Sequence, residues 1–199
     1  MKKFVSLVIA AALMTSSVAQ AAVEKYAYDP AHTQLMFSVE HLGFSFSHGK
    51  FTKFSGGFEF DAEKPGESKV DVTVDTTSIN MDSTEWENHL KGADFFNVEK
   101  FPTMTFKSTK AEKTGDKTGT LSGDLTILGV TKPVTLDVTY NKSGIHPYSK
   151  SYVAGFSATG MVKRSDFGMN YGLPGVADDD KLNIQVEGIR QDFEAVEKK

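Results

Sequence analysis

The stretch DFFNVEKFPTMTF, residues 94–106, decides the interpretation of this chain. It joins a short segment with helical character to a strand through a hinge rich in phenylalanine. Downstream of the hinge, Thr103, Met104, Thr105 and Phe106 alternate polar and apolar residues, which is typical of a strand with one buried face. The fold therefore has to place a lone helix beside strands.

Apolar residues repeat at every second position along most of the chain. The clearest examples are Val70, Val72 and Val74; Leu121, Leu125 and Ile127; Val134, Leu136, Val138 and Tyr140; and Leu182, Ile184 and Val186. Turns containing glycine or proline separate these runs, at residues 56–57, 63–66, 113–116, 141–144 and 174–175. The pattern predicts an all-β, antiparallel protein of about eight or nine strands. Such strands form either a sandwich or a closed barrel, and periodicity alone does not choose between them.

One segment breaks the alternation. Ser83 and neighbouring oxygen-bearing residues can cap a helix, while Trp86 and Leu90 fall on one helical face and Gly92 can end it. This predicts a short helix at Asp82–Lys91. In a barrel such a helix plugs one end, lines a mouth, or packs on the outside.

Several motifs resemble those of one family in order and spacing. They are DPAHT at residues 29–33, FSGGFEFD at 54–61, the 94–106 stretch, LTILGVTKPV at 125–134 and RSDFG at 164–168. Together they resemble the YceI-like family of exported, lipocalin-like barrels that bind polyisoprenoid lipids. The resemblance covers nearly all of residues 23–199, so it implies one antiparallel lipocalin-like barrel domain of about eight strands.

The resemblance also implies a ligand: an isoprenoid, polyprenyl or quinone-like lipid in an apolar tunnel, with its head group near the mouth. Composition alone favours an ordinary close-packed core, although 15 phenylalanines make any interior strongly apolar. Small residues, among them Gly155, Ser157, Thr159 and Gly160, decide whether a barrel of this size stays open. The residues expected to line the tunnel are Phe37, Val39, Phe44, Phe46, Phe58, Phe60, Trp86, Leu90, Phe95, Phe96, Met104, Phe106, Met161 and Phe167.

Four polar residues are expected at the rim, where they would orient a head group: His41, His89, Arg164 and Asp166. The alternative for each is a structural hydrogen bond or a surface ion pair. The chain departs from the family at Trp86, three positions before His89, where relatives often have arginine. This departure leaves the identity of the head group open.

The N-terminus has the features of a secretory signal peptide. Lys2 and Lys3 precede an apolar run from Phe4 to Met14, and small residues at 19–22 offer cleavage near Ala21 or Ala22. Residues 1–22 are therefore expected to be removed during export to the periplasm. No cysteine follows the apolar run, so no stable membrane anchor is expected.

Charge and composition exclude several classes of protein. Removing Lys2 and Lys3 from the 22 basic residues leaves 20 against 26 acidic ones, a net charge of −6, which argues against nucleic acid as a partner. The five histidines include no pair at spacings typical of zinc, so no metal, cofactor or catalytic residue is predicted. The triple aspartate at residues 178–180 lacks the spacing of a calcium loop and is interpreted as a solvated turn.

Three functions remain. The first, favoured by the resemblance, is a binding protein that carries or sequesters an isoprenoid lipid, and it is not an enzyme. The second is an enzyme acting on a lipid or quinone head group, which needs a perturbed polar cluster at the tunnel mouth. The third is a filled barrel that acts as a stress or interaction protein through an exposed apolar patch. A homodimer through an exposed strand edge is left open.

Overall fold

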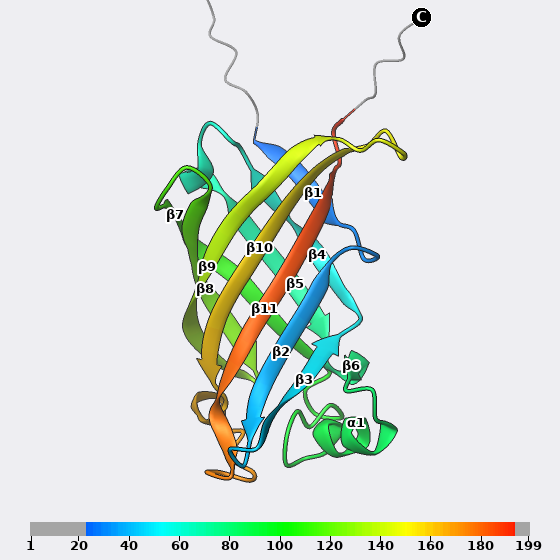
Figure 1. Ribbon diagram of the computed structural model, residues 1–199, viewed down its shortest axis with the longest axis vertical. Helices are drawn as coiled ribbons and strands as arrows, with labels where there is room; N and C mark the ends of the chain where they lie inside the picture. The colour runs from blue at the N-terminus through cyan, green and yellow to red at the C-terminus, as the bar shows by residue number, and fades with distance from the viewer. Residues whose placement is uncertain (1–22, 194–199) are drawn as a thin grey trace, which may run out of the picture.

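The computed structural model describes residues 23–193, which form one antiparallel sheet of eleven strands wrapped into a barrel (Figure 1). The expected signal peptide, residues 1–22, lies outside the described residues. Eight strands follow one another around the barrel, and the last pairs with the first. In spatial order they are β1 (Glu24–Tyr28), β4 (Phe54–Phe60), β5 (Lys69–Asp75), β7 (Thr103–Lys113), β8 (Thr118–Ile127), β9 (Val130–Ile145), β10 (Tyr152–Lys163) and β11 (Val176–Arg190).

Three further strands extend the wall beside the lower half of β11 in Figure 1: β2 (Gln34–His41), β3 (Ser45–Phe51) and β6 (Ile79–Asn80). The long strand β11 pairs with β1 near its C-terminus and with β2 over its first ten residues, from Val176 to Gln185. The change of neighbour falls at Glu187. There the Thr33 hydroxyl donates to the Glu187 carbonyl over 3.0 Å, and the Glu187 amide donates back to the hydroxyl over 3.2 Å.

The prediction of an all-β barrel of about eight antiparallel strands with one short helix is confirmed. The short 3₁₀ turns η1 (Pro65–Glu67), η2 (Thr76–Ser78) and η3 (Arg164–Phe167) link strands at the barrel ends. No helix among residues 23–193 is long and apolar enough to cross a membrane.

The helix α1 (Thr84–Lys91) begins two residues later than predicted. Asp82 has a φ of 54°, which lies outside the right-handed helical region, so the helix cannot include it. Ser83 is the N-cap, and its hydroxyl accepts from the Trp86 amide. The Glu87 carboxylate accepts from the Asn80 side chain and from the Met81 amide, both over 3.1 Å, and so ties the helix to β6 beside the lower barrel.

Glycines on the strands make room for phenylalanine rings on their neighbours. A Cβ atom at Gly188 would overlap the ring of Phe58, and one at Gly123 would overlap the ring of Phe106. The rings can therefore lie flat against the adjacent strand instead of standing upright across the interior. This arrangement keeps bulky aromatic residues in the barrel wall without filling its centre.

Candidate functional site

A cavity of about 370 Å³ runs inside the barrel. Its wall follows β8 from Thr118 to Ile127. Because this strand has 10 residues that each rise about 3.4 Å, the lining extends about 30 Å along the strand. The cavity is therefore long and narrow, and its volume is within the range of about 300–1,000 Å³ that is usual for small-molecule sites.

The apolar residues that repeat at every second position of the sequence form this lining. Every second residue of the long strands faces inward, and nearly all of these are aliphatic: Leu121, Leu125 and Ile127 on β8; Val134, Leu136 and Val138 on β9; Ala158 and Val162 on β10; and Leu182, Ile184 and Val186 on β11. Small side chains keep the centre open, above all Ala158, which stands between Val138 and Ile184 on the neighbouring strands. The small residues named from the sequence, Gly155, Ser157, Thr159 and Gly160, do not line the cavity. The small residues that line it include Ala158 and Gly119.

Aromatic rings surround the upper part of the cavity. The rings of Phe60 and Phe156 meet edge to face with centroids 4.9 Å apart, and Tyr140 lies 5.5 Å from each of them. The Tyr140 hydroxyl bonds to the Ser143 hydroxyl over 2.7 Å, and the Tyr28 hydroxyl donates to a backbone carbonyl. Burial raises the pKa of Tyr28, which keeps it neutral. These tyrosines therefore present apolar ring surface to the cavity while their hydroxyls are satisfied locally.

Charged residues gather where the cavity reaches the surface. The β7–β8 hairpin contributes Glu112, Lys113, Asp116 and Lys117, all exposed, and the β4–β5 connection contributes its own loop residues to the same end. Both loops lie at the top of the barrel in Figure 1. At the opposite end the buried ring of Phe167, from η3, packs against the same core cluster as Val162 and Val134, which line the cavity. The polar mouth is therefore at the β7–β8 hairpin.

Six of the residues expected to line a tunnel do line this cavity: Phe37, Phe58, Phe60, Phe96, Met104 and Phe106. Sequence reasoning missed other aromatic lining residues, among them Tyr28, Phe51, Phe54, Tyr140 and Phe156. Their period-two positions were a usable signal, since Phe156 has the same strand parity as Ala158 and Val162.

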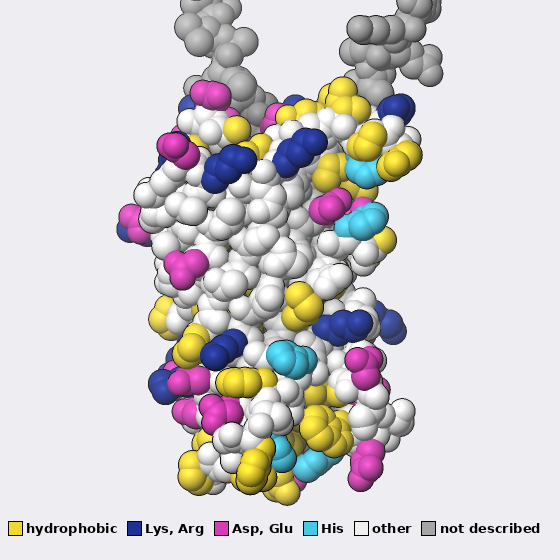
Figure 2. All heavy atoms as spheres, viewed as in Figure 1, with side chains coloured by type: hydrophobic (Ala, Val, Ile, Leu, Met, Phe, Trp, Pro, Cys, Tyr) yellow, Lys and Arg dark blue, Asp and Glu magenta, His cyan; other side chains and the backbone are white. Residues whose placement is uncertain are grey.

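Eight of the expected residues lie outside the lining of this cavity: Val39, Phe44, Phe46, Trp86, Leu90, Phe95, Met161 and Phe167. Phe44 is 88% exposed in the β2–β3 hairpin, and Met161 is 53% exposed because its neighbours on β10 occupy the inward positions. Leu90 packs against the core cluster of Phe51, Val74 and Ile79, and the first two of these line the cavity while Leu90 does not. Hydrophobic side chains on this end of the molecule are visible at the bottom of Figure 2.

The rim residues expected from the sequence lie at the end of the barrel away from the polar mouth. His41 ends β2, His89 is exposed on α1 and packs edge to face against Phe95 and Tyr171, and Asp166 is exposed in η3. They do not surround one opening, because none of the four lines the cavity.

Arg164 has a structural role. Its side chain is only 4% exposed, and its guanidinium donates to four backbone carbonyls, those of Met169, Tyr171, Val176 and Ala177, over 2.8–3.0 Å. These bonds hold the loop between η3 and β11. These bonds match the structural alternative expected for Arg164, whose side chain does not line the cavity.

Asp180 is the acidic residue in the lower part of the lining. It lies on β11 between Val39 of β2 and Val162 of β10. Burial is the largest influence on this carboxyl group and raises its pKa to about 7; the charge of Arg164 opposes the shift, and the charges of Asp178 and Asp179 add to it. Burial in the apolar wall thus favours the protonated, uncharged form of this carboxyl group.

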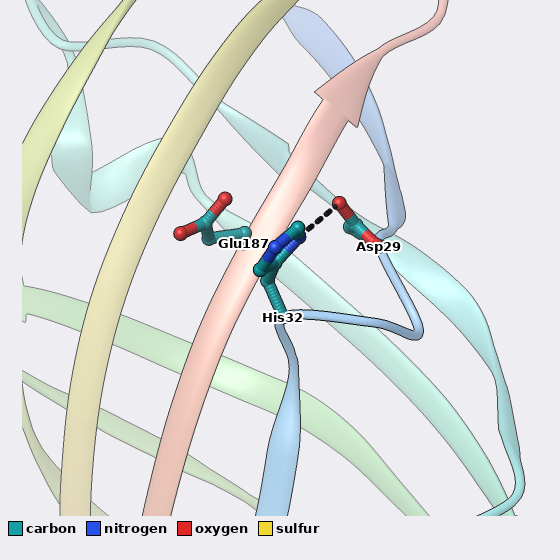
Figure 3. A group of neighbouring side chains, drawn as sticks. All are labelled: Asp29, His32 and Glu187. Atoms are coloured by element: carbon teal, nitrogen blue, oxygen red, sulfur yellow. Dashed lines mark hydrogen bonds and ion pairs between the residues drawn. The ribbon is translucent and has the colours of Figure 1, made fainter. Parts of the chain in front are cut away.

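A second polar cluster lies on the outer wall and comprises Asp29, His32 and Glu187 (Figure 3). The Asp29 carboxylate accepts from the Ala31 amide and pairs with His32 Nδ1 over 2.8 Å. This bond lowers the pKa of Asp29 and raises that of His32. Because the Asp29 carbonyl also accepts from the Thr33 amide, the cluster fixes the turn from β1 to β2 against β11.

Comparison with known proteins places this geometry in context. A sequence profile of the YceI-like domain matches residues 26–188. A UPF0312 protein from Pseudomonas putida is 40% identical over 190 residues, covering 96% of this chain and 98% of that protein. A UPF0312 protein from Pectobacterium atrosepticum is also 40% identical, with the same coverage.

Solved structures share the barrel. The YceI protein of Campylobacter jejuni is 36% identical, with a TM-score of 0.66 over 75% of this chain and 88% of that one. BcnA of Burkholderia cenocepacia has a TM-score of 0.73 at 24% identity, covering 80% and 98% of the two chains. A domain from Saccharophagus degradans described as polyisoprenoid binding has a TM-score of 0.62 at 11% identity, covering 85% and 99%. The last two likenesses show the fold alone.

Proposed function

The chain belongs to the YceI-like family, and we propose that its barrel binds a single long apolar lipid of the isoprenoid class and carries or sequesters it after export to the periplasm. The observation that carries this proposal is the long cavity with a continuous apolar wall and one charged mouth. An extended chain of carbon atoms fits such a shape better than a compact polar metabolite does.

The physical basis of binding is the removal of hydrocarbon from water. Each Å² of apolar surface buried contributes roughly 25 cal/mol, so a ligand that buries about 300 Å² gains about 7–8 kcal/mol before the cost of losing its own freedom. The rings around Phe60 and Phe156 and the aliphatic residues of β9 supply this surface along the whole bore. The affinity therefore depends more on the length and width of the lipid tail than on its detailed chemical structure.

A barrel of this fold is known to take such a ligand. The Saccharophagus degradans domain, which shares the barrel, is described as polyisoprenoid binding. The polar residues named from the sequence as rim groups do not assemble at the cavity, so the residues in hand favour a binding protein over an enzyme acting on a head group. A filled barrel is disfavoured because the cavity occupies its interior.

Export is proposed from the N-terminal sequence, with cleavage near Ala21 or Ala22. Expression of the full chain in a Gram-negative host, followed by N-terminal sequencing of the protein released from the periplasm, tests it. A mature protein beginning near residue 22 or 23 is expected. Full-length protein retained in the cytoplasm would contradict export.

Organic extraction of the purified mature protein, followed by mass spectrometry, tests the ligand. We expect a co-purifying long-chain isoprenoid at close to one molecule per protein. Protein that contains no lipid, and that takes up none when a prenyl quinone, a polyprenol and squalene are offered, would refute the proposal.

A further inference from the structure

Three consecutive aspartates at the start of β11 have different surroundings. Asp178 accepts from the Ser165 amide over 2.8 Å and from the Ser165 hydroxyl over 2.7 Å. Asp179 forms an ion pair with Lys163 over 3.1 Å. Asp180 takes part in no hydrogen bond or ion pair of its side chain among residues 23–193, and it is the one of the three that lines the cavity. All three aspartates lie within β11, so the expectation of a solvated turn at residues 178–180 is wrong.

The elements packed around Asp180 offer it no partner. Val39 of β2 and Val162 of β10 flank it. The cation that acts on its pKa, Arg164 of η3, is engaged elsewhere, because its guanidinium donates to four backbone carbonyls. The other charged groups that act on it are the two aspartates before it on its own strand.

The carboxyl group of Asp180 borders the open space of the cavity. Among the described residues every fully enclosed side-chain nitrogen or oxygen has a hydrogen-bond partner. The oxygens of Asp180 have none, so they are not fully enclosed, and the space that Asp180 lines is the cavity. An unpartnered polar group in a mostly apolar bore is the arrangement by which ligand sites fix orientation and select head groups.

We propose that Asp180 is the specificity-determining contact of the cavity, and that it selects lipids with an uncharged oxygen-bearing head group, a carbonyl or a hydroxyl, over phosphorylated lipids. This inference rests on the proposed function and names the head group that the same cavity takes. The oxygen-bearing end lies in the lower part of the cavity, and the hydrocarbon extends toward the β7–β8 mouth.

The chemistry of the group supports this choice. A protonated carboxyl group both donates and accepts, so it pairs with a carbonyl or a hydroxyl oxygen. A phosphate brought to the same place would be repelled by Asp180 and also by the charges of Asp178 and Asp179 on the same strand, and no unengaged cation faces it there among the described residues. Since burial brings the pKa of Asp180 to about 7, the donating form predominates below neutral pH and is lost above it.

The test measures the affinity of delipidated mature protein for three probes with similar tails: a prenyl quinone, a polyprenyl phosphate and squalene, which carries no oxygen. Four proteins are compared: the wild type, Asp180→Val, Asp180→Asn and the control Asp179→Asn, whose carboxylate pairs with Lys163 outside the cavity. Circular dichroism verifies that each variant is folded.

At pH 6 we expect the wild type to bind the quinone up to about tenfold more tightly than Asp180→Val does, the effect of one hydrogen bond, while squalene binds both equally. The Asp180→Asn variant retains the quinone and loses the weakening that the wild type shows between pH 6 and pH 8.5. The Asp179→Asn variant behaves as the wild type.

An unchanged ratio of quinone to squalene affinity in Asp180→Val would overturn the assignment of Asp180. Tighter binding of the polyprenyl phosphate than of the quinone by the wild type would overturn the choice of head group and favour a phosphate at Lys113 and Lys117 of the mouth. If squalene too fails to bind any of the proteins, the proposed function itself fails and this inference fails with it, so the two failures are distinguishable.

Discussion

Replacing Ala158 with phenylalanine should close the bore at its middle. Ala158 faces the cavity from β10 and stands level with Val138 and Ile184 on the flanking strands. A buried phenylalanine covers about 150–250 Å², and a ligand tail excluded from that much surface at about 25 cal/mol per Å² loses about 4–6 kcal/mol. The lower figure corresponds to a loss of about a thousandfold in affinity.

The variant is expected to fold, because the new ring enters open space. Insertion into a close-packed core costs about 1–3 kcal/mol, and a site beside a cavity lies at or below the low end of this range. The matched control is Thr159→Phe, the same residue placed one position along β10 on the exposed face.

Equilibrium binding of a fluorescent prenyl probe, with the urea midpoint measured on the same samples, checks both expectations. Ala158→Phe should show almost no binding, and Thr159→Phe should bind as the wild type does. Full affinity in a folded Ala158→Phe variant would show that the ligand does not occupy this bore.

Three further outcomes are expected. Asp180→Asn should stabilise the protein at pH 8, because the shift of the Asp180 pKa from 3.8 to about 7 penalises the ionised folded state by up to about 4 kcal/mol. The gain should shrink as the pH falls from 7 and vanish about one unit below 3.8, where the carboxyl is protonated in both states, and a urea-denaturation series across pH checks this. Arg164→Met should destabilise by at least about 3 kcal/mol, since four carbonyls lose charge-assisted donors, and an unchanged urea midpoint would contradict that role. The Asp29–His32 pair should contribute stability above the unfolded pKa of the aspartate and lose it as the pH rises through the raised pKa of His32, so an NMR titration should find a lower His32 pKa in Asp29→Asn than in the wild type.

The strand pattern predicted an antiparallel β protein because inward and outward residues alternate, and this period is a local property of the chain. The family resemblance, not the period, favoured a barrel over a sandwich. The period did not reveal which parity faces inward. Met161 and Phe46 were assigned to the tunnel for their apolar character, yet both are exposed, while Phe156, on the inward parity of β10, was missed. On β10, Phe156 lies two positions from the small inward residue Ala158 and Met161 lies three positions from it, so counting parity from Ala158 would have separated these two residues.

The polar residues were harder to place because their partners are distant in the sequence or belong to the backbone. The four carbonyls that bind Arg164 belong to a loop with no periodic pattern. Asp180 differs from Asp178 and Asp179 only through the pairing of β11 with β2 and β10, a tertiary contact that no local motif encodes. The sequence alone therefore led to the interpretation of all three aspartates as a solvated turn.

The central claim is that a hydrocarbon chain lies inside the barrel and not on its apolar lower end. Photocrosslinking with a prenyl probe that carries a diazirine along its tail, followed by peptide mass spectrometry, tests it most directly. We expect adducts on inward residues of several strands, such as Leu136, Phe156 and Ile184. Adducts confined to exposed residues such as Phe44 and Tyr171, or no adducts at all, would contradict the account.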